Sequence, residues 1–361
     1  MQGQRWGEGG VHIVRPKEVR MRRDASGIFM GGWSRRDVLK AGVLTCATLL
    51  ASPFTGVGWA APRRIRFGVQ TTGTIEGIMW AADPTRWAQK YDIDVETVAF
   101  ASGRPSMEAI MSGAIDIVTS GFGPVISLIA AQPSKYAFLA MYANGDYHAT
   151  LVKPDSPYTK MDELVGKKIG MRIGSGSYIS FLQLLVDRGW KETDFKVVNM
   201  DPSDMGAALT HGLIDAMHSW EPTPSIVEAK KLARRIQSYA KYVWAVMPIF
   251  TSREFAERNR DVVVRLLAAV MESQDLARSD PAKAAEAGAG GLKKKGVEVP
   301  PEALESLIRR MNWDPEITER LRAEMDQQAK VLFEMGRIKA LPRFDVDLSY
   351  LEQAKKLRAR G

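Results

Sequence analysis

Short apolar runs alternate with segments of helical spacing from residue 65 onward. Runs of four to eight residues rich in Val, Ile and Phe are typical of strands, and apolar residues spaced three and four apart are typical of helices. This alternation predicts an α/β fold with mostly parallel sheets. In the first half we predict strands at 65–70, 95–100 and 115–120, each followed by a helix, at 76–91, 106–112 and 124–131.

The pattern then repeats, which predicts a second lobe of the same kind. Apolar runs at 138–142 and 150–152 lead to Pro154 and Pro157, where turn formers suggest a crossing between domains. Strands are predicted at 168–173, 195–200 and 215–219, with helices at 178–188, 205–211 and 225–234.

A final strand at 246–251 would return the chain to the first lobe, and helices follow. These helices are predicted at 252–279, 282–289, 301–309, 315–335 and 348–359. We therefore divide the chain into an N-terminal extension (1–60), a first part of lobe 1 (61–155), lobe 2 (156–245), and a second part of lobe 1 with the C-terminal helices (246–361).

The N-terminal extension contains the parts of an export signal in their usual order. Arg35 and Arg36 precede a moderately apolar stretch at 41–51, which is too short to span a bilayer comfortably. Gly58 and Ala60 supply the small residues of a cleavage site. A twin-arginine signal peptide is the economical interpretation, so we expect a periplasmic protein. The alternative is an amphipathic helix that stays attached, and translation could start at Met1, Met21 or Met30.

Composition limits the possible chemistry. Residues 1–60 hold nine basic and four acidic side chains, so their loss lowers the net charge from +8 to +3. A net charge of +3 does not indicate a nucleic-acid-binding protein. Cys46 is the only cysteine, so the exported form has no disulfide or thiolate site. Three histidines remain, at 148, 211 and 218, with no metal-binding spacing. We expect neither a metal nor a cofactor.

Four loops that follow predicted strands are rich in Gly, Ser and Thr. Small residues let a ligand approach the backbone, and helix N-termini after such loops attract anions. The sequence therefore predicts a small anion, or a molecule with an anionic head, in a cleft between the lobes. Alternatively, these residues serve only as turns and N-caps. The loops are Thr71-Thr72-Gly73-Thr74, Ser102-Gly103, Ser120-Gly121-Phe122-Gly123-Pro124 and Gly174-Ser175-Gly176-Ser177.

The segment after the strand at 215–219 is a further candidate. Trp220 would offer a flat apolar face, and Glu221 could accept a hydrogen bond from a cationic or hydroxyl group. They could equally be a core aromatic and a carboxylate at a helix N-terminus. Arg104 and Arg172 could pair with an anionic head or form surface ion pairs. His148 and its neighbour at 147 could touch a ligand or simply pack.

Patterns of catalysis are missing from the sequence. There is no G-x-S-x-G elbow, and the dinucleotide fingerprint fails because Ile179 occupies the place of its third glycine. No pair of carboxylates is spaced so as to stand out as general acid and base. The sequence gives no support for an enzyme.

In the order of its segments, the chain resembles the periplasmic solute-binding proteins of ABC importers. The resemblance is to the NMT1-like branch that handles nitrate, aliphatic sulfonates, taurine and thiamine-pyrimidine precursors, and it covers residues 65 to about 260. Several stretches together carry it. They are Phe67-Gly68-Val69, Trp87 to Tyr91, Asp94-Val95-Glu96, Met107 to Asp116, Gly123-Pro124, Met161 to Gly170, Gly174 to Ser177, and Gly212 to Ala216 running into Trp220-Glu221-Pro222.

The resemblance implies a two-lobed periplasmic binding protein fold (type II) that closes on a solute. It implies a small anionic or polar solute as ligand, an ABC permease at the inner membrane as partner, and no catalysis; we expect a monomer. The departures are Asp83-Pro84 within the first helix and Asp92-Ile93 before the second strand. The alternatives are an enzyme on this scaffold related to thiamine-pyrimidine synthesis, and a ligand-sensing adaptor. The implied ligand-binding residues are Thr71, Thr72, Gly73, Thr74, Phe122, Gly123, Ser175, Gly176, Ser177, Trp220 and Glu221.

Overall fold

The computed structural model describes residues 64–70, 89–294 and 296–360. The predicted signal peptide, the loop 71–74 and nearly all of the predicted helix 76–91 lie outside these ranges. Within them, no helix combines the length and the apolar character needed to cross a membrane.

The first of two mixed sheets, which forms lobe 1 with its helices, has six strands in the order β11-β4-β10-β3-β1-β2. Strands β1, β2 and β3 pair in parallel, whereas β10 is antiparallel to both β3 and β4, and β11 is antiparallel to β4. The strands are β1 (Arg64–Gln70), β2 (Asp94–Phe100), β3 (Ile117–Thr119), β4 (Tyr136–Gly145), β10 (Ala245–Ser252) and β11 (Met311–Asn312).

The second sheet, which forms lobe 2 with its helices, has five strands in the order β7-β6-β8-β5-β9. Strand β6 is parallel to β7 and β8, and β5 is antiparallel to β8 and β9. The strands are β5 (His148–Val152), β6 (Lys168–Met171), β7 (Lys196–Asn199), β8 (Ala216–Trp220) and β9 (Arg234–Ser238).

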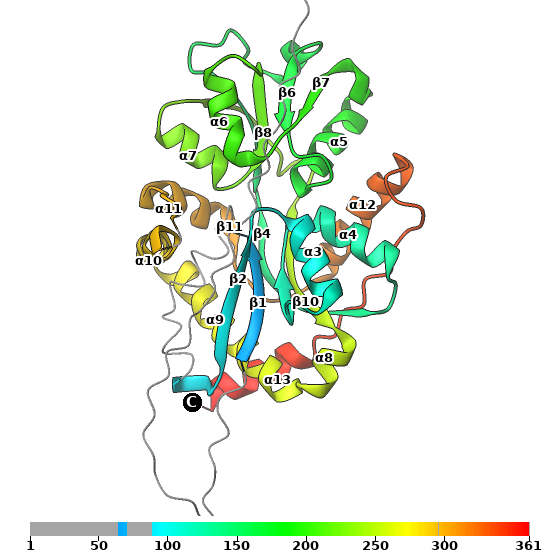
Figure 1. Ribbon diagram of the computed structural model, residues 1–361, viewed down its shortest axis with the longest axis vertical. Helices are drawn as coiled ribbons and strands as arrows, with labels where there is room; N and C mark the ends of the chain where they lie inside the picture. The colour runs from blue at the N-terminus through cyan, green and yellow to red at the C-terminus, as the bar shows by residue number, and fades with distance from the viewer. Residues whose placement is uncertain (1–63, 71–88, 295, 361) are drawn as a thin grey trace, which may run out of the picture. The chain divides into compact units, whose positions relative to one another are not determined.

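Helices flank both sheets, and Figure 1 shows α5, α6 and α7 grouped around β6, β7 and β8. Helices α3 and α4 follow β2 and β3, and two 3-10 helices, at Met161–Leu164 and Glu192–Asp194, lie in lobe 2. The helices are α3 (Gly103–Ser112), α4 (Phe122–Ala131), α5 (Gly176–Arg188), α6 (Pro202–Thr210), α7 (Thr223–Ala229), α8 (Arg253–Arg258), α9 (Arg260–Ser279), α10 (Pro281–Lys294), α11 (Pro301–Arg310), α12 (Glu319–Glu334) and α13 (Ser349–Ala359).

The sheets differ from the prediction of mostly parallel pairing. Strands β4, β5 and β10, which flank the points at which the chain changes lobes, all run antiparallel to a neighbour. The chain passes into lobe 2 between β4 and β5, ahead of the crossing predicted at Pro154. Both strands are completely buried, and Gly145, with φ of 145°, ends the first of them.

Two predicted helices differ from the structure, one by ending early and the other by dividing in two. The helix predicted at 225–234 stops at Ala229, and its last predicted residue begins β9 instead. The helix predicted at 252–279 divides into α8 and α9 at Asn259, whose φ and ψ of −130° and 33° are not helical.

The apolar core passes through both lobes. One cluster of buried side chains joins Val125 of α4 and Phe250 of β10 to Phe181 of α5 and Met325 of α12. A further cluster, with Leu266 of α9, covers the opposite face of the lobe 1 sheet. The two lobes are therefore in direct apolar contact beside the site described next.

Candidate functional site

A cavity of about 620 Å³ is lined by residues of both lobes. Lobe 1 contributes the starts of α3 and α4, and lobe 2 contributes the loop after β6 and the ends of β5 and β8. Its volume lies within the range of pockets that enclose small organic molecules. Of the predicted site residues, Phe122, Ser175, Gly176, Ser177 and Trp220 line it.

Three helices begin at this cavity. Its lining includes Ser102 and Gly103 at α3, Gly121 and Phe122 at α4, and the start of α5. None of the three helices has an acidic residue in its first turn, and neither Ser102 nor Gly121 caps its helix through a side chain. Because the first N–H groups of a helix lack partners within the helix, three positive helix ends face one cavity.

Ser175 shapes the third of these helix ends. Its hydroxyl accepts a hydrogen bond from the Tyr178 amide at 3.1 Å, which makes it the N-cap of α5, and it lies 2.9 Å from the hydroxyl of Ser177. This cap fixes the direction from which the chain enters α5. The hydroxyls of both serines are thereby held beside the first turn.

Gly123 does not line the cavity but allows the lobes to meet at its edge. A Cβ atom at this position would lie 2.8 Å from the backbone carbon and oxygen of Ser175, closer than real Cβ contacts. Glycine is therefore required where the start of α4 approaches the loop before α5. The sequence suggested Gly123 as a ligand contact, and the structure places it at a contact between lobes.

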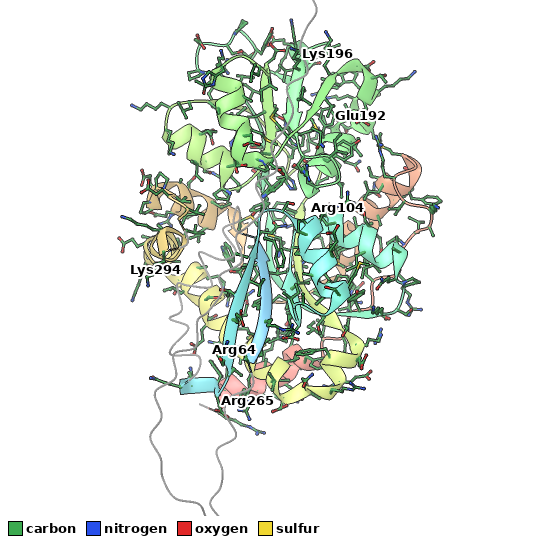
Figure 2. The ribbon with its side chains drawn as sticks, viewed as in Figure 1. Arg64, Arg104, Glu192, Lys196, Arg265 and Lys294 are labelled. Carbon is green, nitrogen blue, oxygen red and sulfur yellow. The ribbon has the colours of Figure 1, made fainter. Side chains whose placement is uncertain are left out.

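Two arginines line the cavity, one from each lobe. Arg104 pairs with Glu108 at 3.4 Å, and Arg172 pairs with Asp201 at 3.4 Å. Figure 2 labels Arg104 at the end of α3 nearest to lobe 2. The Arg104 pair is solvent-exposed and the Arg172 pair partly so. A guanidinium has five N–H donors, so each arginine can keep its carboxylate partner and still donate to an anion in the cavity.

Glu221 follows the cavity residue Trp220 but does not line the cavity itself. Its carboxylate is fully buried and accepts hydrogen bonds from Arg235 and Arg310, each at 2.7 Å. It also accepts from the backbone amide of Ser225 at 3.0 Å. Because Arg310 belongs to α11 of lobe 1, this carboxylate joins the lobes and is not directed at a ligand.

His148 and Trp220 are opposite each other on β5 and β8, and both line the cavity. His148 Nδ1 and Trp220 Nε1 have no hydrogen-bond partner within the described part of the chain, although each side chain is about 95% buried. Burial, and secondarily the neighbouring His218, lowers the pKa of His148 to about 3. The ring is therefore neutral near pH 7, and both residues can offer an uncharged N–H group to a ligand.

Apolar residues of lobe 1, which the sequence did not identify, form a further part of the wall. Met107, Met111, Leu128 and Met247 all line the cavity. Methionine side chains are flexible and polarisable, so they adapt to apolar groups of different shape. The only sequence signal for a cavity wall was the helical spacing of Met107 and Met111 on α3. This spacing is equally typical of a packed core.

The described ranges contain no group of three His, Cys, Asp or Glu side chains arranged to hold a metal ion. Thr71, Thr72, Gly73 and Thr74 lie outside the described residues, so their predicted role stays a prediction.

The model of the family described as NMT1/THI5 like matches residues 78–284. The chain belongs to this family. Among similar family members, a protein of Escherichia coli strain K12 named for binding aliphatic sulfonates is 27% identical over 246 residues, 68% of this chain and 76% of the relative. The taurine-binding periplasmic protein of the same organism is 25% identical over 224 residues, 60% of this chain and 69% of the relative.

The fold of this NMT1/THI5-like chain is also that of a solved structure. The crystal structure of the periplasmic aliphatic sulphonate binding protein SsuA from Escherichia coli superposes with a TM-score of 0.66 at 23% identity. The match covers 80% of this chain and 91% of the other. The predicted two-lobed α/β fold of periplasmic binding proteins is thereby confirmed.

Proposed function

We propose that this protein is the periplasmic solute-binding component of an ABC importer and that it captures a small organic anion between its lobes. The observation that carries the proposal is the convergence of three uncapped or hydroxyl-rich helix N-termini, from two lobes, on one cavity. The curated relatives named for sulfonate and taurine binding support the same role. Export through the twin-arginine signal at residues 35–36 and a monomeric state belong to this proposal.

The anionic head would lie at the helix ends. Backbone N–H groups and serine hydroxyls can surround the oxygens of a sulfonate or carboxylate, and the helix dipoles favour negative charge there. Arg104 and Arg172 lie in the same lining and add two positive charges. Such a site binds by position and electrostatics and requires no catalytic group.

The rest of the solute would be apolar and uncharged. The lining includes methionine and leucine side chains of lobe 1, and Glu108, paired with Arg104, is the only carboxylate among the described lining residues. Glu221, which the sequence suggested for a cationic or hydroxyl group of the ligand, is held by two arginines. The described wall therefore has no free carboxylate for an ammonium group.

A thermal-shift screen of the purified protein tests this function. A ligand that binds only the native state at one hundred times its Kd adds about 2.7 kcal/mol of stability, so binders raise the melting temperature. We expect sulfonates to give the largest shifts in a panel that also holds taurine, nitrate, pyrimidines and aromatic acids. No shift with any member would contradict the proposal.

Ethanesulfonate and taurine form the sharpest comparison within that panel, because they differ only by the amino group. Burying an ammonium group without a partner is costly, so ethanesulfonate should bind about tenfold more tightly than taurine. Tighter binding of taurine would show that a carboxylate reaches the solute after all.

A further inference from the structure

A chain of buried polar side chains lies beneath the first turn of α5. His218 on β8 is fully buried, with Nδ1 3.0 Å from the hydroxyl of Thr150 and Nε2 2.7 Å from the carbonyl oxygen of Ser177. The Thr150 hydroxyl lies 2.7 Å from that of Tyr239. We call these three residues the Tyr239–Thr150–His218 chain.

The carbonyl oxygen of Ser177, at one end of the Tyr239–Thr150–His218 chain, determines the direction of its hydrogen bonds. A carbonyl oxygen can only accept, so Nε2 of His218 must carry the proton that it donates to Ser177. Nδ1 is then the acceptor of the neutral ring and accepts a hydrogen bond from the Thr150 hydroxyl, whose oxygen in turn accepts one from Tyr239. Burial lowers the pKa of His218 to about 4, so the neutral ring required by this arrangement is the stable form near pH 7.

The Tyr239–Thr150–His218 chain ends at the N-terminal turn of α5, which faces the cavity. Ser175, Gly176 and Ser177 line the cavity, and the Ser177 carbonyl receives the His218 donor from one side and the Ser180 hydroxyl, at 2.7 Å, from another. Thr150 and His218 are directly opposite each other on β5 and β8. The chain therefore ties the start of α5 to the centre of the lobe 2 sheet.

We propose that His218 is a positioning residue for ligand binding: through Thr150 and Tyr239 it holds the N-terminal turn of α5 where its amides and hydroxyls meet the anionic head of the solute. An apolar residue would fill the same space, but the Ser177 carbonyl would lose its hydrogen bond to the lobe 2 sheet and would be held only from within α5. The inference rests on the proposed function for its ligand, whereas the ordering of α5 can be measured without any ligand.

The test is Thr150→Val, which keeps the shape of the side chain and removes the hydroxyl. With ethanesulfonate as the probe, we expect a rise of about tenfold in Kd, and an acceleration of about tenfold in amide hydrogen exchange of residues 176–180 in the free protein. Thr150→Ser restores the hydroxyl and should return both quantities to near the wild-type values. If Thr150→Val does not fold, Tyr239→Phe removes the other hydroxyl of the chain and serves in its place.

Thr251→Val is the matched control. Thr251 is a fully buried threonine of lobe 1 whose hydroxyl donates to the Asp116 carbonyl, so its loss weakens a hydrogen bond far from α5. It should leave exchange at residues 176–180 and affinity unchanged. Unchanged exchange and affinity in Thr150→Val would overturn the inference, as would faster exchange with unchanged affinity. If the wild type binds no sulfonate while exchange still responds, the proposed function fails and the ordering role of the chain remains.

Discussion

At the scale of single residues, five of the residues proposed from the sequence line the cavity, and Glu221 instead pairs with two arginines. Small and hydroxyl residues after strands led to Ser175, Gly176 and Ser177, because such residues at a helix start are recognisable from local sequence alone. Glu221 looked equally suitable, but its partners decide its role. Arg310 lies 89 residues away, on another lobe, and no local pattern could have shown that pairing.

The two buried histidines make the stability of the protein depend on pH. His148 and His218 have pKa values lowered to about 3 and about 4 in the native state, mainly by burial, whereas the unfolded value is about 6.5. Between about pH 4 and pH 6.5 the unfolded state binds protons that the native state excludes, so stability falls as the pH falls through this window.

Each histidine should contribute a slope of about 1.4 kcal/mol per pH unit within that window. Urea unfolding between pH 7 and pH 4.5 measures it. His148→Gln should lower the slope by about this amount even if the variant is less stable at pH 7. A slope that is the same in wild type and variant would contradict the buried neutral ring.

At the scale of elements, the alternation of strands and helices was predictable from the sequence. The positions at which the chain crosses between the lobes were not. Periodicity located α3, α4, α5 and α6 because each has a clear apolar face. The helix predicted at 225–234 reached only the first residue of β9, and the sequence did not predict this strand, which forms by pairing with β5. The antiparallel strands likewise depend on contacts between distant segments.

The N-cap of α5 gives a prediction at this scale. Ser175→Ala removes the hydroxyl that accepts from Tyr178, so it should cost about 1 kcal/mol in the free energy of unfolding and also weaken ethanesulfonate binding. Ser252→Ala removes the same kind of cap from α8, where the hydroxyl accepts from Phe255 at 3.1 Å. This control should lose similar stability in urea unfolding and keep its affinity. Equal affinities in the two variants would argue against a ligand at α5.

At the scale of the whole molecule, the lobes are held together around the cavity by three kinds of contact. Glu221 of lobe 2 accepts from Arg310 of lobe 1, Arg337, which follows α12, donates to Tyr178 at 2.7 Å, and Gly123 lets α4 meet the loop before α5. These contacts bring the helix ends of both lobes to one place. Captured solute would stabilise this arrangement, and the permease would recognise it.

Gly123→Ala interferes with this approach directly, because its Cβ would lie 2.8 Å from the Ser175 backbone and would force the lobes apart. Gly290→Ala is a control in α10, where an added Cβ meets no atom within 4 Å.

Titration calorimetry with ethanesulfonate on the wild type and these two variants shows directly whether an anion is held between the lobes. We expect saturable binding by the wild type and by Gly290→Ala, and affinity lower by about tenfold or more in Gly123→Ala. Absence of binding by the wild type, or equal affinity in all three proteins, would contradict an anion held between closing lobes.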